Sequence, residues 1–434
     1  MTISSSLNAG VMGLRANATR LATISDNIAN SSTNGYKRSE VDFSSMVINQ
    51  RNSAYSAGGV RTTTYKDVAS AGSLISTGNA LDIAINGNGL IPVTDSFGVN
   101  QSSAERDFLL TPTGGFSPDE NGNLTTQSGL FLLGWPTDAN GVVQTGSRDS
   151  SNSLVPVNID ASQFSASPTR NLSLGVNLPA NSTVAGATAE PFTLPIEYYD
   201  NLGRAQTLTY TFNPTVPATG ASNSWAVSVT DSAGDPATSI ASFDVTFNDG
   251  AGNGGSIASI TAGAGTSYDP ATGEMSFDVV SGPITAFIGR AGESSGLTQL
   301  AAPFSPINVT KDGSPVGELQ NVEIDQEGNV QAIFSSGFRR TLYQIPVVDV
   351  PNPNGLTAVN NQAYTVSPDS GDLYLWDAGD GPVGGYAGYA LMESNTDIAA
   401  ELTSLIETQR AYSSNAKIIQ TVDEMLQETT NLKR

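Results

Sequence analysis

The chain contains neither cysteine nor histidine in its 434 residues. Disulfides, thiol nucleophiles, histidine-based catalytic triads and metal sites built on Cys or His are therefore excluded. Basic residues are also scarce, with 19 Lys and Arg against 41 Asp and Glu, which gives a net charge of -22. This acidic balance argues against nucleic acid and anionic membrane surfaces as partners. No apolar run is long enough to cross a membrane, so we expect no membrane insertion.

The sequence also lacks the features of a signal peptide. The first residues have no basic segment followed by a continuous apolar run, because Arg15 and Arg20 interrupt the apolar pattern. If the protein leaves the cell, we expect a route that needs no cleaved signal peptide.

The charge that is present is unevenly distributed. Seven basic and four acidic residues lie between Met1 and Gly72, giving +3, and four basic and seven acidic residues lie between Leu391 and Arg434, giving -3. The segment between them therefore carries the whole -22. We expect near-neutral termini that can pack densely and a middle that repels its own copies and stays solvated.

The last forty residues carry a heptad pattern. Apolar residues recur every seven positions and Leu402 lies beside them; the row is Leu391, Ile398, Leu405, Tyr412, Ile419 and Leu426. Together with the absence of Pro and Gly after Gly388, this predicts a long helix over 395–434. Such a helix would be about 55 Å long, at roughly 1.5 Å per residue. It is amphipathic and needs a partner to bury its apolar face.

The first thirty residues supply a candidate partner. A second heptad row predicts a helix over 1–30, and Asn34-Gly35 is a typical stop signal; the row and its neighbour are Leu7, Leu14, Leu21, Ile28 and Val11. On periodicity alone, a helical hairpin packed on a globular core explains both helices. Polar residues at Asn17, Ser25, Gln409 and Asp423 make the apolar seam narrow, which suits helices that complete their burial against other subunits.

The middle of the chain reads as β structure without a catalytic site. Residues 31–72 are polar and predict an extended linker, and 73–164 with 303–394 contain strand–turn–strand units such as 115–124 and 322–330. The turn acids, for instance Asp119 and Asp325, do not form a calcium-loop pattern, and no cleft aromatics accompany them as a glycosidase would require. The Gly87 and Gly89 pair lacks the third glycine and the helix of a phosphate loop. We expect no catalytic residue, metal site or cofactor.

An insertion at 165–302 is rich in Gly, Ser, Thr and Ala and has short alternating apolar runs with turn signals every eight to twelve residues. This pattern predicts an antiparallel β-sandwich or barrel. The predicted fold is mainly β with α-helical termini that form a coiled-coil-like core, plus two β-rich outer domains. The outer domain of 73–164 and 303–394 would be discontinuous, with 165–302 inserted in it.

The run from Ile24 to Lys37 closely resembles the signature shared by bacterial flagellar rod, hook and hook-associated proteins. Its matching positions are Ser25, Asn27, Ile28, Ala29, Asn30, Thr33, Gly35 and Tyr36. Near the C-terminus, the segments 390–399, 409–412 and 423–427 resemble the corresponding part of hook proteins. Ser31-Ser32 departs from the Ala and Asn more usual in the family.

The resemblance implies a structural subunit and no enzyme. It implies a homopolymer that forms the curved hook and transmits torque from rod to filament, located outside the cell on the flagellum. The implied partners are the chain itself, a distal rod protein, a hook cap protein, a hook-filament junction protein and the export apparatus. Subunit packing would use Leu7, Val11, Leu14, Leu21, Ile28, Ile398, Leu402, Leu405, Tyr412, Ile419 and Leu426. A distal rod protein is the alternative, but rod subunits lack a second large domain. A secreted β-rich adhesin, a third alternative, would not explain heptads at both ends.

Overall fold

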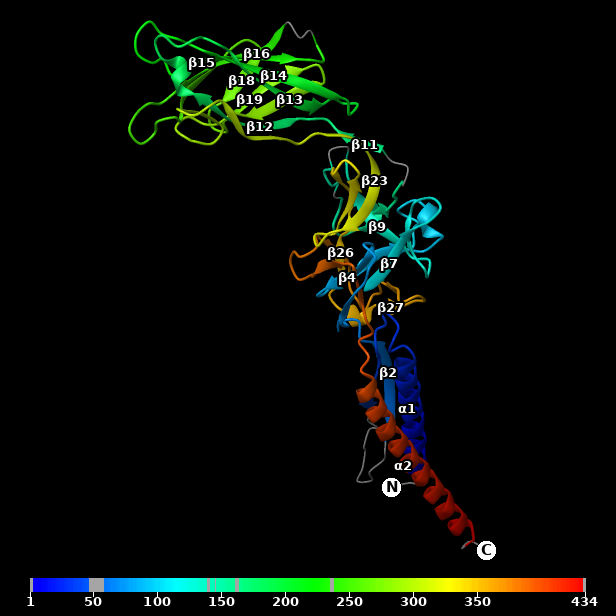
Figure 1. Cartoon of the computed structure of the whole chain (residues 1–434). Coiled ribbons are helices and arrows are strands. Elements are labelled where there is room, and N and C mark those ends of the chain that lie inside the picture. The colour runs from blue at the N-terminus through cyan, green and yellow to red at the C-terminus, as the bar shows by residue number, and fades with distance from the viewer. Residues whose placement is uncertain are drawn as a thin grey trace. The chain divides into compact units, whose positions relative to one another are not determined.

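The structure is a computed structural model that describes residues 3–46, 58–138, 141–144, 146–160, 164–234 and 238–431. It is mainly β with one long α-helix at each end, which confirms the predicted fold class (Figure 1). The chain forms two compact units, the first of Met1–Ala161, Asn321–Ala332 and Arg340–Arg434, and the second of Ser162–Gln320 and Ile333–Arg339. The second unit thus interrupts the first in sequence. The finer domain limits expected above stay predictions.

The terminal helices are α1 (Ile3–Ala29) and α2 (Ile398–Asn431). After α1 the chain turns at Gly35, whose positive φ of 73° favours glycine. Asp397 caps α2, since its Oδ1 accepts hydrogen bonds from the backbone N–H of Ala399 (2.8 Å) and Ala400 (3.2 Å). The expectation that Leu391 belongs to the helical row is wrong. Leu391 lies in β31 (Ala390–Met392), where it pairs with Ile75 of β3 (Leu74–Ser76).

The two helices lie side by side and antiparallel (Figure 1). A Cβ on Gly10 would come 3.2 Å from Ile419, and one on Gly13 would come 2.8 Å from Asn415. Near the other end of α1, the Asn27 amide contacts the carboxylate of Glu401. The order of these contacts reverses along the two helices. Gly10 and Gly13 therefore permit a close approach of the two helices near the start of α1.

A two-stranded antiparallel sheet packs against α1. It consists of β1 (Ser39–Ser45) and β2 (Val60–Lys66), in a register that runs from Ser39↔Lys66 to Ser45↔Val60. Within the predicted 31–72 linker, 39–45 and 60–66 are thus strands of one sheet, while residues 47–57 lie outside the described residues.

The rest of the first unit is a set of short antiparallel pairings around a small core. Its strands are β4 (Asp82–Asn86), β5 (Ile91–Thr94), β6 (Leu109–Thr111), β7 (Thr113–Pro118), β8 (Leu124–Thr126), β9 (Phe131–Pro136), β10 (Val155–Pro156), β26 (Val347–Asp349), β27 (Thr357–Ala358), β28 (Tyr364–Thr365), β29 (Tyr374–Trp376) and β30 (Gly385–Gly388), and short 3-10 turns lie at Gly98–Asn100, Ser151–Ser153 and Pro353–Gly355. The predicted hairpin at 115–124 is present as β7 and β8, with Pro118 opposite Leu124. Trp135 lies at the centre of the core and donates its ring N–H to Ser153 Oγ at 3.0 Å.

The second unit contains a sandwich of two sheets. The first sheet has the order β13-β14-β15-β16-β17 and is antiparallel throughout; the second has the order β18-β19-β20-β12-β21, with β22 paired to β12. Their strands are β12 (Asn171–Pro179), β13 (Phe192–Tyr199), β14 (Ala205–Pro214), β15 (Ser224–Asp231), β16 (Ser239–Phe247), β17 (Ile257–Ala262), β18 (Thr266–Asp269), β19 (Glu274–Val279), β20 (Gly282–Phe287), β21 (Leu297–Leu300) and β22 (Ser305–Lys311). A 3-10 turn at Ala180–Thr183 follows β12.

Side chains from both sheets meet in one core that includes Trp225, Phe212 and Phe277. The insertion contains the expected sandwich, but the antiparallel pattern is incomplete, because β12 pairs in parallel with β20 and β21. β11 (Phe164–Ser167) pairs with β23 (Ser314–Ile324), and the chain returns to the first unit within β23; β24 (Asn329–Phe334) and β25 (Arg339–Gln344) follow.

Candidate functional site

The face of α2 that turns toward α1 is a heptad row offset from the predicted one. Glu401, Thr408 and Val422 are buried, and Asn415, in the same register, lies against Gly13. We call these four residues the contact row. The predicted row flanks it, with Leu405 and Ile419 half-buried and Ile398, Tyr412 and Leu426 exposed. Packing within one chain thus uses the contact row together with Leu405 and Ile419, and it leaves several large apolar side chains of α2 exposed.

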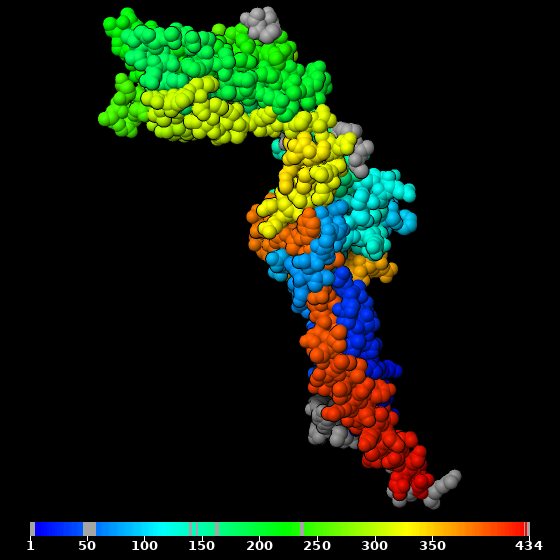
Figure 2. Space-filling model, viewed as in Figure 1, coloured from blue at the N-terminus to red at the C-terminus, as the bar shows by residue number. Residues whose placement is uncertain are grey.

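Exposed large apolar side chains of α2 form what we call the uncovered apolar row. Leu402 is 48% exposed and Ile406 is 50% exposed, although both are large and apolar. The row consists of Ile398, Leu402, Ile406, Tyr412 and Leu426. Figure 2 shows α2 with one face open to solvent along the helix. An apolar surface of this kind on a helix marks a surface for association.

On α1 the predicted row is partly covered. Leu7, Val11, Leu14, Leu21 and Ile28 are all half-buried. The fully buried side chains of this helix lie outside that row, and they include Ala16, Ile24 and Asn27. The predicted packing residues of α1 therefore retain surface that the single chain does not bury.

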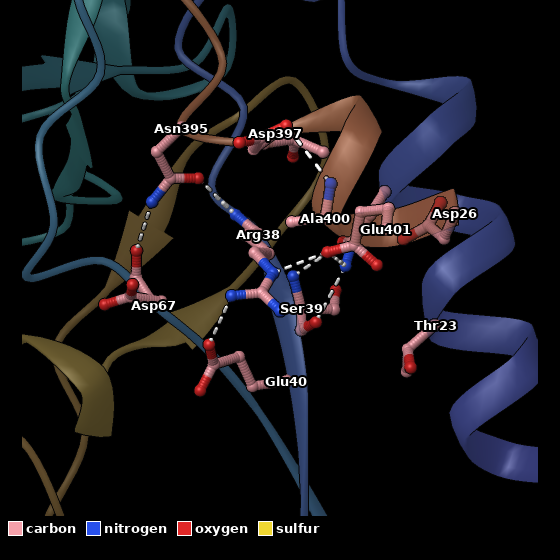
Figure 3. A network of polar contacts seen from close by, with 12 residues as sticks. Thr23, Asp26, Arg38, Ser39, Glu40, Asp67, Asn395, Asp397, Ala400 and Glu401 are labelled. Carbon is pink, nitrogen blue, oxygen red and sulfur yellow. Dashed lines mark hydrogen bonds and ion pairs between the residues drawn. The ribbon is translucent and has the colours of Figure 1, made fainter. Parts of the chain in front are cut away.

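A polar network fastens the first turn of α2 to α1 and β1 (Figure 3). The Glu401 carboxylate is 1% exposed, and its Oε1 accepts hydrogen bonds from Arg38 Nε at 2.5 Å and from Asn27 Nδ2 at 3.1 Å. Arg38 also pairs with Glu40 Oε1 at 2.8 Å. A buried carboxylate needs such partners, because desolvation of an unpaired charge is costly. Glu401 therefore fixes where α2 begins relative to α1.

Asn27 is the centre of this network. Its Nδ2 donates to the Ser39 carbonyl at 2.9 Å and its Oδ1 accepts from the Ser39 N–H at 2.8 Å, so that the side chain pairs with β1 as a strand would. The Tyr36 hydroxyl lies 3.1 Å from the same Oδ1 and shares its single proton between Asn27 and the Asp26 carboxylate. With the bond to Glu401, one amide holds both helices and the sheet together. Alanine or aspartate at this position could not make all of these bonds.

Asn395 connects the network to the segment that follows β2. Its Oδ1 accepts from the Arg38 N–H at 2.7 Å, and its Nδ2 donates to the Asp67 carbonyl at 3.0 Å (Figure 3). The Asn395 N–H donates to the Tyr36 carbonyl at 3.3 Å. The segment before α2 is thus fixed by backbone hydrogen bonds as well as by side chains.

The signature residues lie mainly in the turn after α1. Asn30 Nδ2 donates to the Asp26 carbonyl and carboxylate, at 2.9 and 3.0 Å, and Thr33 Oγ1 lies 3.4 Å from Asn30 Oδ1. The Gly35 N–H donates to the Met392 carbonyl at 2.7 Å. Ser25 bonds only within its own helix, to the Leu21 carbonyl, and Ala29 is exposed. Part of the signature thus contacts the segment that precedes α2, whereas Ser25 and Ala29 do not take part in this contact.

Tyr36 is the aromatic anchor of this turn. Its hydroxyl donates to Asp26 Oδ2 at 2.9 Å, and Lys66 Nζ lies 4.1 Å from the centre of its ring. Burial, together with the neighbouring Asp26 carboxylate, raises the pKa of Tyr36 to about 12. The hydroxyl therefore stays protonated and available as a donor at any physiological pH.

Sequence reasoning missed Arg38 and Glu401 as members of this site. Both look like ordinary surface charges, and 363 residues separate them. The one available signal is that Glu401 begins a heptad row of its own with Thr408, Asn415 and Val422. Within the described ranges, no group of three Asp or Glu side chains could hold a metal ion, and neither helix is apolar enough over sufficient length to cross a membrane.

The helices, signature turn and inserted unit define a class of protein, the structural subunits of the bacterial flagellar axis. Three family models match the chain: "Flagella basal body rod protein" over residues 7–37, "Flagellar basal body protein FlaE D2 domain" over 158–314, and "Flagellar basal body rod FlgEFG protein C-terminal" over 388–432. The first and third fall on the helices of the network.

Relatives that span the whole chain narrow the class. The flagellar hook proteins FlgE of Rhizobium meliloti and Brucella suis are each 32% identical over 100% of both chains, and that of Salmonella typhimurium is 29% identical over 99% of this chain and 100% of its own. The crystal structure of Helicobacter pylori flagellar hook protein FlgE2 covers 74% of this chain and 99% of that chain, with 14% identity and a TM-score of 0.48. The chain belongs to the flagellar hook protein family. It is a structural subunit of the hook, which forms by self-polymerisation of such subunits.

Proposed function

We propose that the terminal helices of many copies pack into the inner tube of the hook and that the uncovered apolar row is buried there between copies. The observation that carries this proposal is the exposure of Leu402 and Ile406, about half of each side chain, on a helix already paired with α1. Since the contact row uses small and polar residues, most of the apolar burial of α2 is left for other subunits. Leu7, Val11, Leu14, Leu21 and Ile28 would contribute from α1.

The polar network would give each subunit a defined helix pair before it joins the tube. Asn27, Arg38 and Glu401 hold α1, β1 and α2 in one geometry. A subunit whose helices are already aligned loses less conformational freedom on assembly. The same rigid pairing would carry torque along the tube without slippage between the two helices of one subunit.

The β-rich parts would form the outer layers, with the predicted limits of 31–72 for the linker, 73–164 with 303–394 for the outer-core domain and 165–302 for the inserted domain. The segment between the termini carries the acidic excess of -22. Charged, solvated surfaces repel one another weakly and do not lock into one arrangement, which suits a curved tube whose subunits slide as it turns. We propose on this basis that the polymer is a torque-transmitting universal joint between rod and filament.

The proposed partners are those of such a joint: a distal rod protein at one end, a hook-filament junction protein at the other, a hook cap protein during growth, and the export apparatus. We further propose that the chain reaches the outside of the cell without a cleaved signal peptide. The alternative of a distal rod protein is less well supported, because the full-length relatives are hook proteins.

Immunogold electron microscopy of intact source cells, with antibody against residues 165–302, tests the proposal. Gold on a short curved segment between the cell envelope and the filament is the expected result. Gold that appears only after the envelope is removed would favour the rod, and diffuse gold over the cell surface would favour an adhesin.

A further inference from the structure

The first unit contains a cavity of about 360 Å³ between the segment after β2 and the loops around β5, β26 and β31. Its wall is largely apolar and includes Val68, Leu90, Val350, Pro353 and Met392. One basic side chain, Lys37, also lines it. Pockets of this kind, apolar with a few placed polar groups, are typical of ligand sites.

Lys37 is 4% exposed and is the only basic side chain among the described residues that is fully buried. Its Nζ donates to the Ser70 carbonyl at 2.6 Å and lies 3.8 Å from Met392 Sδ, a weak acceptor. An ammonium group has three N–H donors, so two are left without a strong acceptor. In the part of the chain that the structure describes, Lys37 has no ion-pair partner. A buried charge without a counter-ion is costly and is a frequent sign of a functional site.

One carboxylate acts on this ammonium and another lines the cavity. Burial lowers the pKa of Lys37 to about 8, against the opposing attraction of Asp67. Asp349 lines the cavity, and burial raises the pKa of its carboxyl group. At neutral pH the lysine therefore still carries most of its positive charge.

We propose that this cavity binds a monocarboxylate with a short aliphatic chain, whose carboxylate pairs with Lys37 and whose hydrocarbon part packs against the apolar wall. A dianion such as phosphate fits less well, because its second negative charge would lie without a partner against the apolar wall. The carboxylate has two sources, a free short-chain acid or the side chain of a glutamate from a second copy of this chain. Both supply the missing acceptor and counter-charge.

Nuclear magnetic resonance of the unassembled protein, with ¹³C in the ε position of lysine, tests the proposal. The sequence has only five lysines, so the Lys37 signal is assigned by its loss in Lys37→Met. Butyrate should raise the pKa of Lys37 by about one unit or more, because a carboxylate at ion-pair distance favours the charged amine. Chloride or phosphate at the same ionic strength should leave the pKa of Lys37 unchanged. The exposed Lys417 serves as the internal control, and its signal should not respond to any of the three anions.

The same titration on sedimented polymer, by solid-state measurement, distinguishes the two sources. A shift with butyrate in the unassembled protein identifies a free acid as a ligand. A shift that appears only on polymerisation, without butyrate, identifies a carboxylate of the second copy. If the pKa of Lys37 is unchanged both with butyrate and in the polymer, or if phosphate shifts it as much as butyrate, the proposal is wrong.

Discussion

The substitution Glu401→Gln tests how firmly the polar network holds α2. Glu401 Oε1 accepts two hydrogen bonds, from Arg38 Nε and Asn27 Nδ2, and the carboxylate is 1% exposed. The amide keeps the shape of the side chain and one acceptor oxygen but removes the negative charge. Hydrogen bonds to charged groups contribute about 1.5–3 kcal/mol. Because the Arg38 side chain is 36% exposed and can still pair with Glu40, we expect a loss near the lower end, about 1.5–2 kcal/mol.

Native-state hydrogen exchange is the suitable assay, since it reports the opening of α2 without unfolding the second unit. In unassembled protein, amides in the first turns of α2 should exchange about 10- to 30-fold faster in the variant, as every 1.4 kcal/mol is a factor of ten. Glu407→Gln is the matched control, because Glu407 is exposed on the same helix, and it should change the exchange rates less than about twofold. Equal exchange rates in both variants would refute the role given to Glu401.

Three further predictions concern Gly13, Leu402 and Lys37. Gly13→Leu should separate the helices and abolish polymers seen by electron microscopy, because even its Cβ would come 2.8 Å from Asn415; the control Ala22→Leu, at an exposed position of α1, should assemble, and normal polymers from Gly13→Leu would contradict the packing. Leu402→Asp should leave the melting temperature of the unassembled chain unchanged yet prevent assembly, if this half-exposed side chain completes its burial between copies as proposed; a large drop in melting temperature would show instead that it packs within the chain. The first unit should become more stable to heat as pH rises from about 8 toward 10, because the pKa of Lys37 is lowered from 10.5 to about 8 and the unfolded chain keeps its proton in this interval. Lys37→Met should remove that rise, and an identical pH profile in both proteins would refute the assignment of the titration to Lys37.

The sequence predicted the helices well because their evidence is local. Heptad spacing, the Asn34-Gly35 stop and the absence of breakers fixed α1 and α2 to within a few residues. The pattern could not tell where the long helix begins, because Leu391 continues the row by chance while pairing with β3. It also could not tell which face of α2 meets α1. Large apolar residues suggested one row, yet only Ile419 of that row meets Gly10, while Asn415 of the contact row lies against Gly13.

The sequence could not predict pairings between distant residues, because its patterns are local. The Asn27–Glu401 bond joins residues 374 positions apart, and neither residue carries a pattern that points to the other. In the second unit, alternating runs predicted strands correctly, but they could not show that β12 pairs in parallel with β20 and β21. Periodicity alone could not show that the two terminal helices act together. The resemblance to the flagellar axial proteins implied it.

The central claim is that the uncovered apolar row is buried between copies in the inner layer of the hook. Helical reconstruction by cryo-electron microscopy of hooks isolated from the source cells tests it most directly. We predict that Ile398, Leu402 and Ile406 of each subunit contact helices of neighbouring copies around a central channel. A reconstruction in which these side chains face solvent, or in which the terminal helices lie on the outside of the tube, would contradict the account.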